Sequence, residues 1–195
     1  MSVYAQPDNL EPEDGYLSCH QIYEEYYIDL KKILFENLSY YTYARAIVIP
    51  SFGKAQSLVS IDSAEGSTYL TYRILKRQVR FDKKDTNRIV FREYKMKLDT
   101  SLTNRLQELF FLATSNVRYP EEPYYGSDGV TYIFMSSKQF YGTRCGKIWS
   151  PKGGRLYGLV QITDWLAKCG ERKEIIDKDK MKEKVDGLIE SFRKK

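Results

Sequence analysis

The amino-acid sequence predicts an α+β fold: an antiparallel sheet of about five to seven strands, with an N-terminal helix and C-terminal helices packed mainly on one face. Two observations lead to this prediction. Between residues 44 and 98 the chain runs through four consecutive segments with strand periodicity, separated by short polar turns. Segments with helical periodicity come before this run and after it, so strands and helices do not alternate throughout as parallel βαβ units require.

The first helix is expected from about Cys19 to Leu38, after an extended arm formed by residues 1–15. Ser18 followed three residues later by Gln21 matches a capping box, which marks a helix start. No low-complexity linker interrupts the chain after the arm, so residues 16–195 are expected to form a single α+β domain. The side chains that recur at helical spacing are Tyr23, Tyr26, Tyr27, Leu30, Ile33 and Leu34.

Four strands are expected next, in the segments "ARAIVIPS", "SLVSID", "STYLTYRILKR" and "RIVFREYKMKL". In the third segment Leu70, Tyr72 and Ile74 alternate with residues of the opposite face, Arg73 among them. Because polar turns separate the four segments, they predict an antiparallel meander.

The second half of the chain predicts another helix that ends before the two prolines of "RYPEEP". It is expected to start near Asp99, Thr100 or Ser101, any of which could cap it. The segment "SDGVTYIFMS" predicts a turn followed by a strand, with Gly129 supplying a positive φ, and Cys145–Trp149 returns as the partner strand. Two C-terminal helices are then expected, over about Tyr157–Cys169 with Gly170 as its stop, and over about Asp179–Arg193.

Composition limits the classes of function. The net charge of +5 is mild for a nucleic-acid binder, and no apolar run approaches the roughly 18 residues of a membrane span. A single histidine, His20, excludes sites built from several histidines. No nucleotide-binding fingerprint occurs, so no cofactor is expected. The three cysteines, Cys19, Cys145 and Cys169, contain no C-x-x-C and define no disulfide framework.

The N-terminus predicts export to the periplasm or the extracellular space. Val3 and Ala5 form a small-x-small pattern directly before Gln6, which resembles the end of a cleaved secretory signal. An ordinary cytoplasmic terminus is the alternative interpretation.

A family resemblance points the same way. The segment "SDGVTYIF…GTRCGKIWSPKGGRLYGLVQITDWL" resembles an uncharacterised family of exported bacterial proteins with a D-G-x-x-Y-x-F strand, a W-S-P-x-x-G turn and a Leu-rich helix. It covers about Asp128 to Leu166, with a shorter similarity at "LTYR". The resemblance implies a non-cytoplasmic bacterial protein and no catalytic residues.

We therefore expect a non-catalytic exported binding protein. Its partner would be a protein, as for an inhibitor or an immunity-type module, or an anionic cell-envelope ligand held in an aromatic groove. Tryptophan and arginine contribute heavily to interfaces, and cations favour an anionic partner. The predicted contact patch consists of Arg73, Tyr132, Arg144, Lys147, Trp149 and Lys152. The competing interpretation makes Trp149 a core residue with solvated cations as neighbours.

Two other classes of function stay open. A hydrolase would use paired carboxylates or Cys145, whose thiol pKa Arg144 and Lys147 would lower if they lie close. A nucleic-acid-binding module would use aromatic residues interleaved with cations between Tyr132 and Lys152. The carboxylates considered for a hydrolase are Asp62, Glu93 and Asp128. The oligomeric state does not follow from the sequence.

Overall fold

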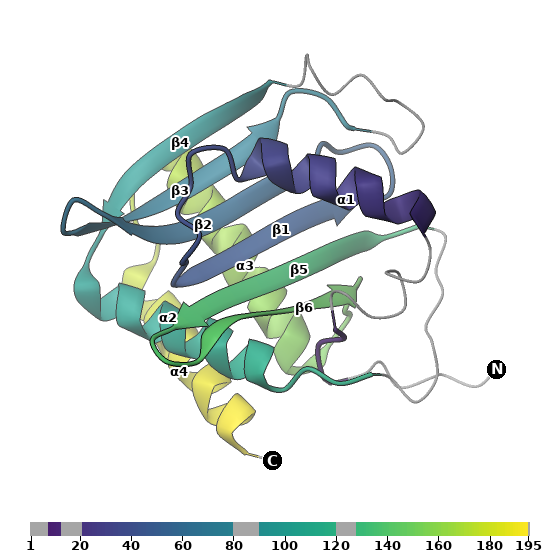
Figure 1. Cartoon of the computed structure of the whole chain (residues 1–195). Coiled ribbons are helices and arrows are strands. Elements are labelled where there is room, and N and C mark those ends of the chain that lie inside the picture. The colour runs from purple at the N-terminus through teal and green to yellow at the C-terminus, as the bar shows by residue number, and fades with distance from the viewer. Residues whose placement is uncertain (1–7, 13–20, 80–89, 120–127, 195) are drawn as a thin grey trace.

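The computed structural model describes residues 8–12, 21–79, 90–119 and 128–194, with the backbone alone for residues 21–25. Within these ranges it shows six strands in one antiparallel sheet and four helices (Figure 1). This confirms the predicted α+β class and the number of strands. Val3, Ala5, Ser18, Cys19 and His20 lie outside these ranges.

The first four strands form the predicted meander, and the sheet order is β4-β3-β2-β1-β5-β6. β1 therefore lies inside the sheet, paired with β2 on one side and with β5 on the other. The elements are α1 (Gln21–Leu34), β1 (Ala44–Pro50), β2 (Ser57–Ala64), β3 (Ser67–Leu75), β4 (Phe91–Leu98), α2 (Thr100–Ser115), β5 (Val130–Lys138), β6 (Gly142–Trp149), α3 (Gly154–Arg172) and α4 (Lys178–Arg193).

Helix α1 lies across one face of the sheet (Figure 1). Leu30 and Leu34, four residues apart and therefore on one side of the helix, are buried in a cluster with Ile47 and Leu58. The helix ends at Leu34, earlier than the expected Leu38. Past this end, Asn37 has a left-handed φ of 57°, and Arg73 Nη1 of β3 donates to the carbonyl oxygens of Leu34 and Glu36 at 2.8 and 2.7 Å.

The opposite face carries α2, α3 and α4, so three of the four described helices pack on one face as predicted (Figure 1). The larger core lies here, and the rings of Phe110 and Phe134 meet edge to face in it at 5.8 Å. Of the three expected cap residues, Asp99 caps α2: its Oδ1 accepts a hydrogen bond from the Leu102 N–H at 2.9 Å.

Two glycines have roles that differ from those expected. Gly170 does not stop α3, which continues to Arg172 and is capped by Lys173 at φ 56°. Gly170 instead faces β3, where an added Cβ would lie 2.7 Å from the Tyr72 Cβ. Gly129 is not among the glycines with positive φ; an added Cβ there would lie 2.4 Å from the Trp149 ring. Both positions are thus determined by close packing.

The described part of the N-terminal arm, residues 8–12, lies against the edge strand β6. Glu11 and Lys147 exchange two backbone hydrogen bonds of 2.8 Å. Leu10 is fully buried, and an added Cβ on Gly146 would lie 2.8 Å from the Leu10 Cβ. The glycine therefore makes room for the arm.

Candidate functional site

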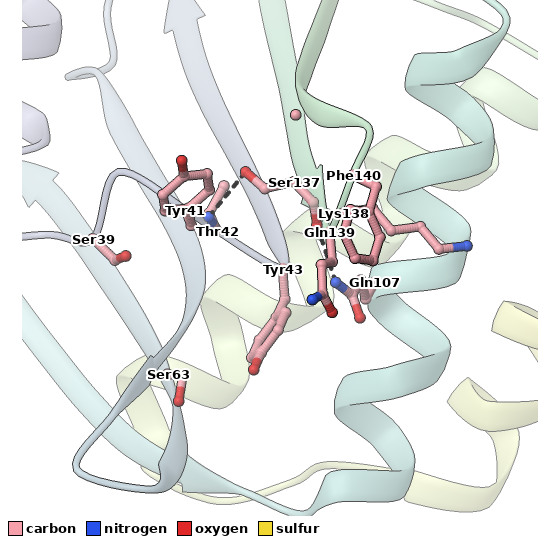
Figure 2. A pocket seen from close by; sticks show the side chains of 11 residues that line it. Ser39, Tyr41, Thr42, Tyr43, Ser63, Gln107, Ser137, Lys138, Gln139 and Phe140 are labelled. Carbon is pink, nitrogen blue, oxygen red and sulfur yellow. Dashed lines mark hydrogen bonds between the residues drawn. The ribbon is translucent and has the colours of Figure 1, made fainter.

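A pocket of about 760 Å³ opens at the end of the sheet where β1 begins and β5 ends (Figure 2). This volume falls within the range of about 300–1,000 Å³ that is usual for small-ligand sites. Four segments that are distant in sequence form it: the loop before β1, the end of β2, the middle of α2 and the β5–β6 hairpin. The lining residues are Ser39, Tyr41, Thr42, Tyr43, Ser63, Gln107, Ser137, Lys138, Gln139, Phe140 and Gly142.

The side chains of the lining are mostly neutral. They offer three aromatic rings, four hydroxyls from serine and threonine, two glutamine amides and one ammonium group. The ammonium belongs to Lys138, and Figure 2 shows it directed away from Tyr41 and Ser63. Its Nζ lies 4.8 Å from the centre of the Phe111 ring on α2. The interior therefore presents neutral hydrogen-bonding groups beside apolar rings.

Four exposed aromatic residues lie in this lining or directly next to it in sequence, and we call them the aromatic rim. They are Tyr40, Tyr41, Phe140 and Tyr141, which are 78%, 69%, 95% and 59% exposed. The rings of Tyr40 and Tyr41 meet edge to face at 5.3 Å. Exposed aromatic side chains gathered at one place mark an interaction surface, because their contact with water is unfavourable until a ligand covers them.

The tip of the β5–β6 hairpin holds Phe140 in a strained conformation. The Tyr141 N–H donates to the Lys138 carbonyl oxygen at 3.0 Å, which places Phe140 third in a four-residue turn. Its φ is 67°, in the left-handed region where glycine or asparagine is usual and a bulky residue is an outlier. Neither burial nor backbone preference explains a phenylalanine here, and such strain clusters at functional sites.

Hydrogen bonds hold the two walls of the pocket together. Thr42, just before β1, and Ser137, at the end of β5, are both buried. The Thr42 N–H donates to the Ser137 Oγ at 3.2 Å (Figure 2). The Ser137 N–H donates to the Thr42 carbonyl oxygen at 2.8 Å. Ser137 Oγ also lies 2.8 Å from Thr143 Oγ1 on β6. These hydrogen bonds link the segment before β1 to the end of β5 and the start of β6 at the floor of the pocket.

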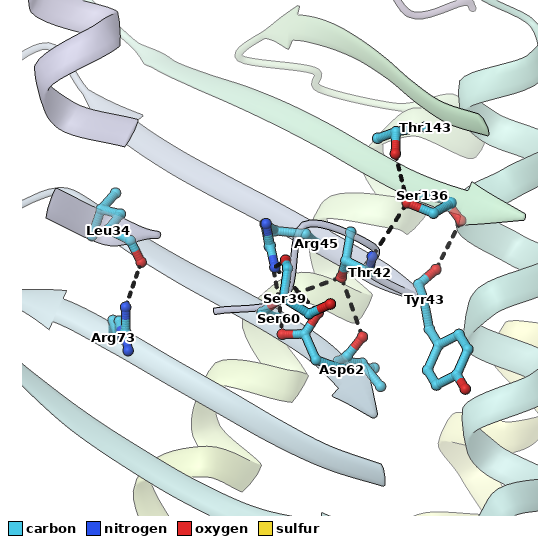
Figure 3. A network of polar contacts seen from close by, with 12 residues as sticks. Leu34, Ser39, Thr42, Tyr43, Arg45, Ser60, Asp62, Arg73, Ser136 and Thr143 are labelled. Carbon is cyan, nitrogen blue, oxygen red and sulfur yellow. Dashed lines mark hydrogen bonds and ion pairs between the residues drawn. The ribbon is translucent and has the colours of Figure 1, made fainter. Parts of the chain in front are cut away.

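A buried ion pair supports the loop that leads into this floor. Arg45 Nη2 lies 3.1 Å from Asp62 Oδ1 and also donates to the Ser39 carbonyl oxygen at 2.8 Å (Figure 3). Ser60 Oγ accepts from Arg45 Nε at 2.8 Å and donates to Asp62 Oδ2 at 2.6 Å. Burial lowers the pKa of Arg45, and the charge of Asp62 opposes that shift. The pair ties the pocket residue Ser39 to the sheet.

The six residues of the predicted contact patch do not share one surface. The face of the sheet that packs on α2 and α3 carries Tyr132 of β5 and Arg144 of β6. The opposite face, on the side of α1, carries Lys147 and Trp149 of β6, because each is an odd number of residues from Arg144. Arg73 is on the α1 face too, but four strands from Lys147, about 19 Å at the usual strand spacing. The prediction of a single patch is therefore wrong in its geometry.

Several of these residues have structural contacts instead. Arg73 is 4% exposed and holds the end of α1, and its guanidinium lies 4.5 Å from the Phe91 ring centre. Tyr132 is half-buried and stacks with Phe134, and burial raises the pKa of its phenol to about 12. Trp149 is half-buried against Gly129, whereas Lys152 is exposed before α3. Arg144 lies in the β6 strand of the hairpin that lines the pocket, two residues after the lining residue Gly142, so we retain it as a candidate site residue.

The residues proposed for hydrolysis do not converge. Asp62 is paired with Arg45, Glu93 with Arg73, and Asp128 is exposed at the start of β5. Cys145 packs on the α1 side of the sheet, away from the pocket lining. In the part of the chain that the structure describes, no group of three or more His, Cys, Asp or Glu residues could hold a metal ion.

Sequence reasoning missed most of the pocket. The signal that could have revealed it is "SYYTY", residues 39–43, because three tyrosines in a predicted loop have no strand or helix face to fill. The sequence did point to part of the hairpin: the stretch of aromatic and basic residues that we considered for nucleic-acid binding includes Lys138, Phe140 and Tyr141. Their position beside the tyrosines depends on the pairing of β1 with β5.

Comparisons of the chain with protein-family models, curated proteins and solved structures find no match. The resemblance to exported bacterial proteins therefore stays a prediction. None of the described helices is long and apolar enough to cross a membrane.

Proposed function

We propose that this chain is a non-catalytic binding protein, and that its ligand is a carbohydrate bound in the pocket at the end of the sheet. The observation that carries this proposal is the combination of a neutral, hydroxyl- and amide-rich pocket with an aromatic rim. An exported bacterial protein that binds an envelope glycan fits both the pocket and the N-terminal sequence.

The chemistry of sugars matches that of the pocket. A pyranose ring has an apolar face of C–H groups, which packs on exposed aromatic rings such as Tyr41 and Phe140. Its hydroxyls are both donors and acceptors, as are the side chains of serine, threonine and glutamine. Because Thr42 and Ser137 are already fixed by mutual hydrogen bonds, little side-chain entropy is lost when a ligand binds to this floor.

The other classes of function receive less support. Nucleic acid requires several cations to neutralise its phosphates, and the described lining contains one, Lys138. A hydrolase requires convergent ionisable groups, whereas the described lining offers hydroxyls and amides. An inhibitor or immunity-type protein would dock on the aromatic rim, and this interpretation is the second candidate because the rim is so exposed.

The test compares two equally exposed aromatic residues. Tyr41 lines the pocket and Phe52 lies beyond the opposite end of β1, and both are 69% exposed. The wild-type chain is screened on an array of bacterial polysaccharide fragments, and hits are titrated by calorimetry. Tyr41→Ala should weaken binding about tenfold, roughly 1.4 kcal/mol, while Phe52→Ala should leave it unchanged.

Two results would contradict the proposal: no carbohydrate binds, or Tyr41→Ala and Phe52→Ala bind equally well. Capture of a protein partner that depends on Tyr41 would favour the second candidate instead. The predicted export has its own test, because fractionation of the native host should recover the protein outside the cytoplasm.

A further inference from the structure

We propose that the carbohydrate ligand carries an acidic group, a carboxylate or a sulfate, and that Lys138 and Arg144 recognise it beside the pocket. This inference rests on the proposed function, since it names the class of sugar that the same site takes. The neutral pocket leaves one feature unexplained: two cations of the β5–β6 hairpin, Lys138 and Arg144, lie beside it over aromatic rings.

Lys138 and Arg144 share one aromatic platform, formed by Phe111 of α2 and Tyr141 of the hairpin. The two rings meet edge to face at 5.5 Å. Lys138 Nζ lies 4.8 and 5.7 Å from the two ring centres, and Arg144 Cζ lies 5.1 and 5.7 Å from them. Attraction to the ring electrons holds both cations in place.

Neither cation is neutralised within the part of the chain that the structure describes. No carboxylate there comes within ion-pair distance of Lys138 or Arg144, although Arg105 and Arg155 each have an aspartate at 2.8 and 3.1 Å. One donor of Arg144, Nη1, binds Ser115 Oγ at 2.8 Å. Two like charges on one platform repel each other, and a bound anion would relieve that repulsion.

The planar guanidinium of Arg144 favours an anion with two oxygens that it can bind side by side. A guanidinium offers parallel N–H groups that match the two oxygens of a carboxylate or a sulfate, and a lysine ammonium adds a second point charge. Because the aromatic rings already hold both side chains, less conformational entropy is lost on binding than for unrestrained surface cations.

The cation pair is continuous with the pocket. Lys138 lines the pocket with its stem, while its ammonium is directed toward α2 (Figure 2). Phe140 stands between Lys138 and Tyr141 in the turn. When one sugar ring occupies the pocket, its acidic substituent, or the next sugar of the chain, would extend across the hairpin toward Lys138 and Arg144. A free anion would leave the pocket empty, so the structure favours an acidic saccharide.

The test uses probes that differ only in charge. Short oligogalacturonides are compared with their methyl esters, and sulfated carrageenan oligosaccharides, which contain no carboxylate, with their desulfated forms, by titration calorimetry at low and high salt. A charged member of either pair should bind at least about tenfold more tightly than its neutral form, and added salt should reduce the difference. The two pairs distinguish carboxylate from sulfate.

The variant Lys138→Gln/Arg144→Gln should abolish this preference, so that the charged and the neutral member of each pair bind it with equal affinity. The matched control is Arg92→Gln/Lys95→Gln on β4, which also removes one arginine and one lysine; Lys95 likewise lies over an aromatic ring, 4.4 Å from the centre of Tyr69. Circular dichroism confirms that both variants fold.

The outcomes separate the two proposals. Equal binding of charged and neutral probes, or a preference that survives in Lys138→Gln/Arg144→Gln, would overturn the acidic-sugar inference and leave carbohydrate binding intact. A single-stranded oligonucleotide that binds more tightly than every saccharide would also overturn it. Failure of all saccharides, charged and neutral, would overturn the proposed function itself.

Discussion

Replacing Phe140 by glycine should make the protein more stable and less able to bind its ligand. Phe140 occupies a left-handed position with φ of 67° at the tip of the β5–β6 hairpin, and its ring is 95% exposed. Glycine adopts this conformation without steric cost. The same substitution removes the most exposed ring of the aromatic rim, so folding and binding should change in opposite directions.

The size of the stability change follows from two opposing effects. A left-handed conformation costs a non-glycine residue about 1–2 kcal/mol, which the substitution removes. Glycine has more conformational freedom than phenylalanine in the unfolded chain, and this entropy reduces the stabilisation by about 0.5–1 kcal/mol. Loss of the ring itself should change little, because it buries almost no surface. The net stabilisation should be about 0.5–1 kcal/mol, or about 2 °C in melting temperature.

Urea unfolding of the wild type, Phe140→Gly and Phe140→Ala separates backbone from side chain. Phe140→Ala removes the ring but keeps the unfavourable φ, so its stability should match that of the wild type. Both variants should lose about tenfold in affinity for the carbohydrate found in the screen, roughly 1.4 kcal/mol. If Phe140→Gly unfolds at lower urea than Phe140→Ala, or if either binds as the wild type does, the reasoning about this position fails.

Two further predictions concern charged groups that folding removes wholly or partly from water. Arg45→Met leaves the Asp62 carboxylate buried without its partner and should cost about 3–5 kcal/mol of stability, whereas Arg45→Met/Asp62→Leu should cost clearly less; strict additivity of the single variants in chemical denaturation would contradict this. Burial raises the pKa of Glu11 above 4.5, against the opposing attraction of Lys147, so the folded chain holds that proton more tightly than the unfolded chain does. Ionisation of Glu11 therefore destabilises the fold as pH rises above 4.5, and Glu11→Gln should raise the melting temperature at neutral pH but not at about pH 4; an equal gain at both values would refute the assignment.

Periodicity explains why so much of the fold follows from the sequence. Leu70 and Tyr72 face one helix layer and Arg73 the other, as the alternation in their segment predicted. The capping role of Asp99 likewise depends on a hydrogen bond within three residues. Such patterns indicate which side of each helix or strand is buried. They can be recognised in the sequence because they involve residues only a few positions apart.

The predicted contact patch failed because closeness in sequence was given more weight than strand geometry. Arg144 and Lys147 are three residues apart, and in a strand an odd spacing directs side chains to opposite faces. Trp149 illustrates a second limit. The sequence suggests a turn glycine at Gly129, but the indole packed against it shows that close contact requires the glycine there.

By itself, the sequence determined the class of the fold, the meander of the first four strands and the position of the helices, because these depend on periodicity and caps within short segments. Only the tertiary structure decided where the candidate site lies. The tyrosines of "SYYTY" and the tip at Phe140 are nearly a hundred residues apart, and they meet because β1 pairs with β5, with Ala46 opposite Phe134. That pairing is selected by burial of the common core, a free energy summed over the whole chain, which no local pattern contains.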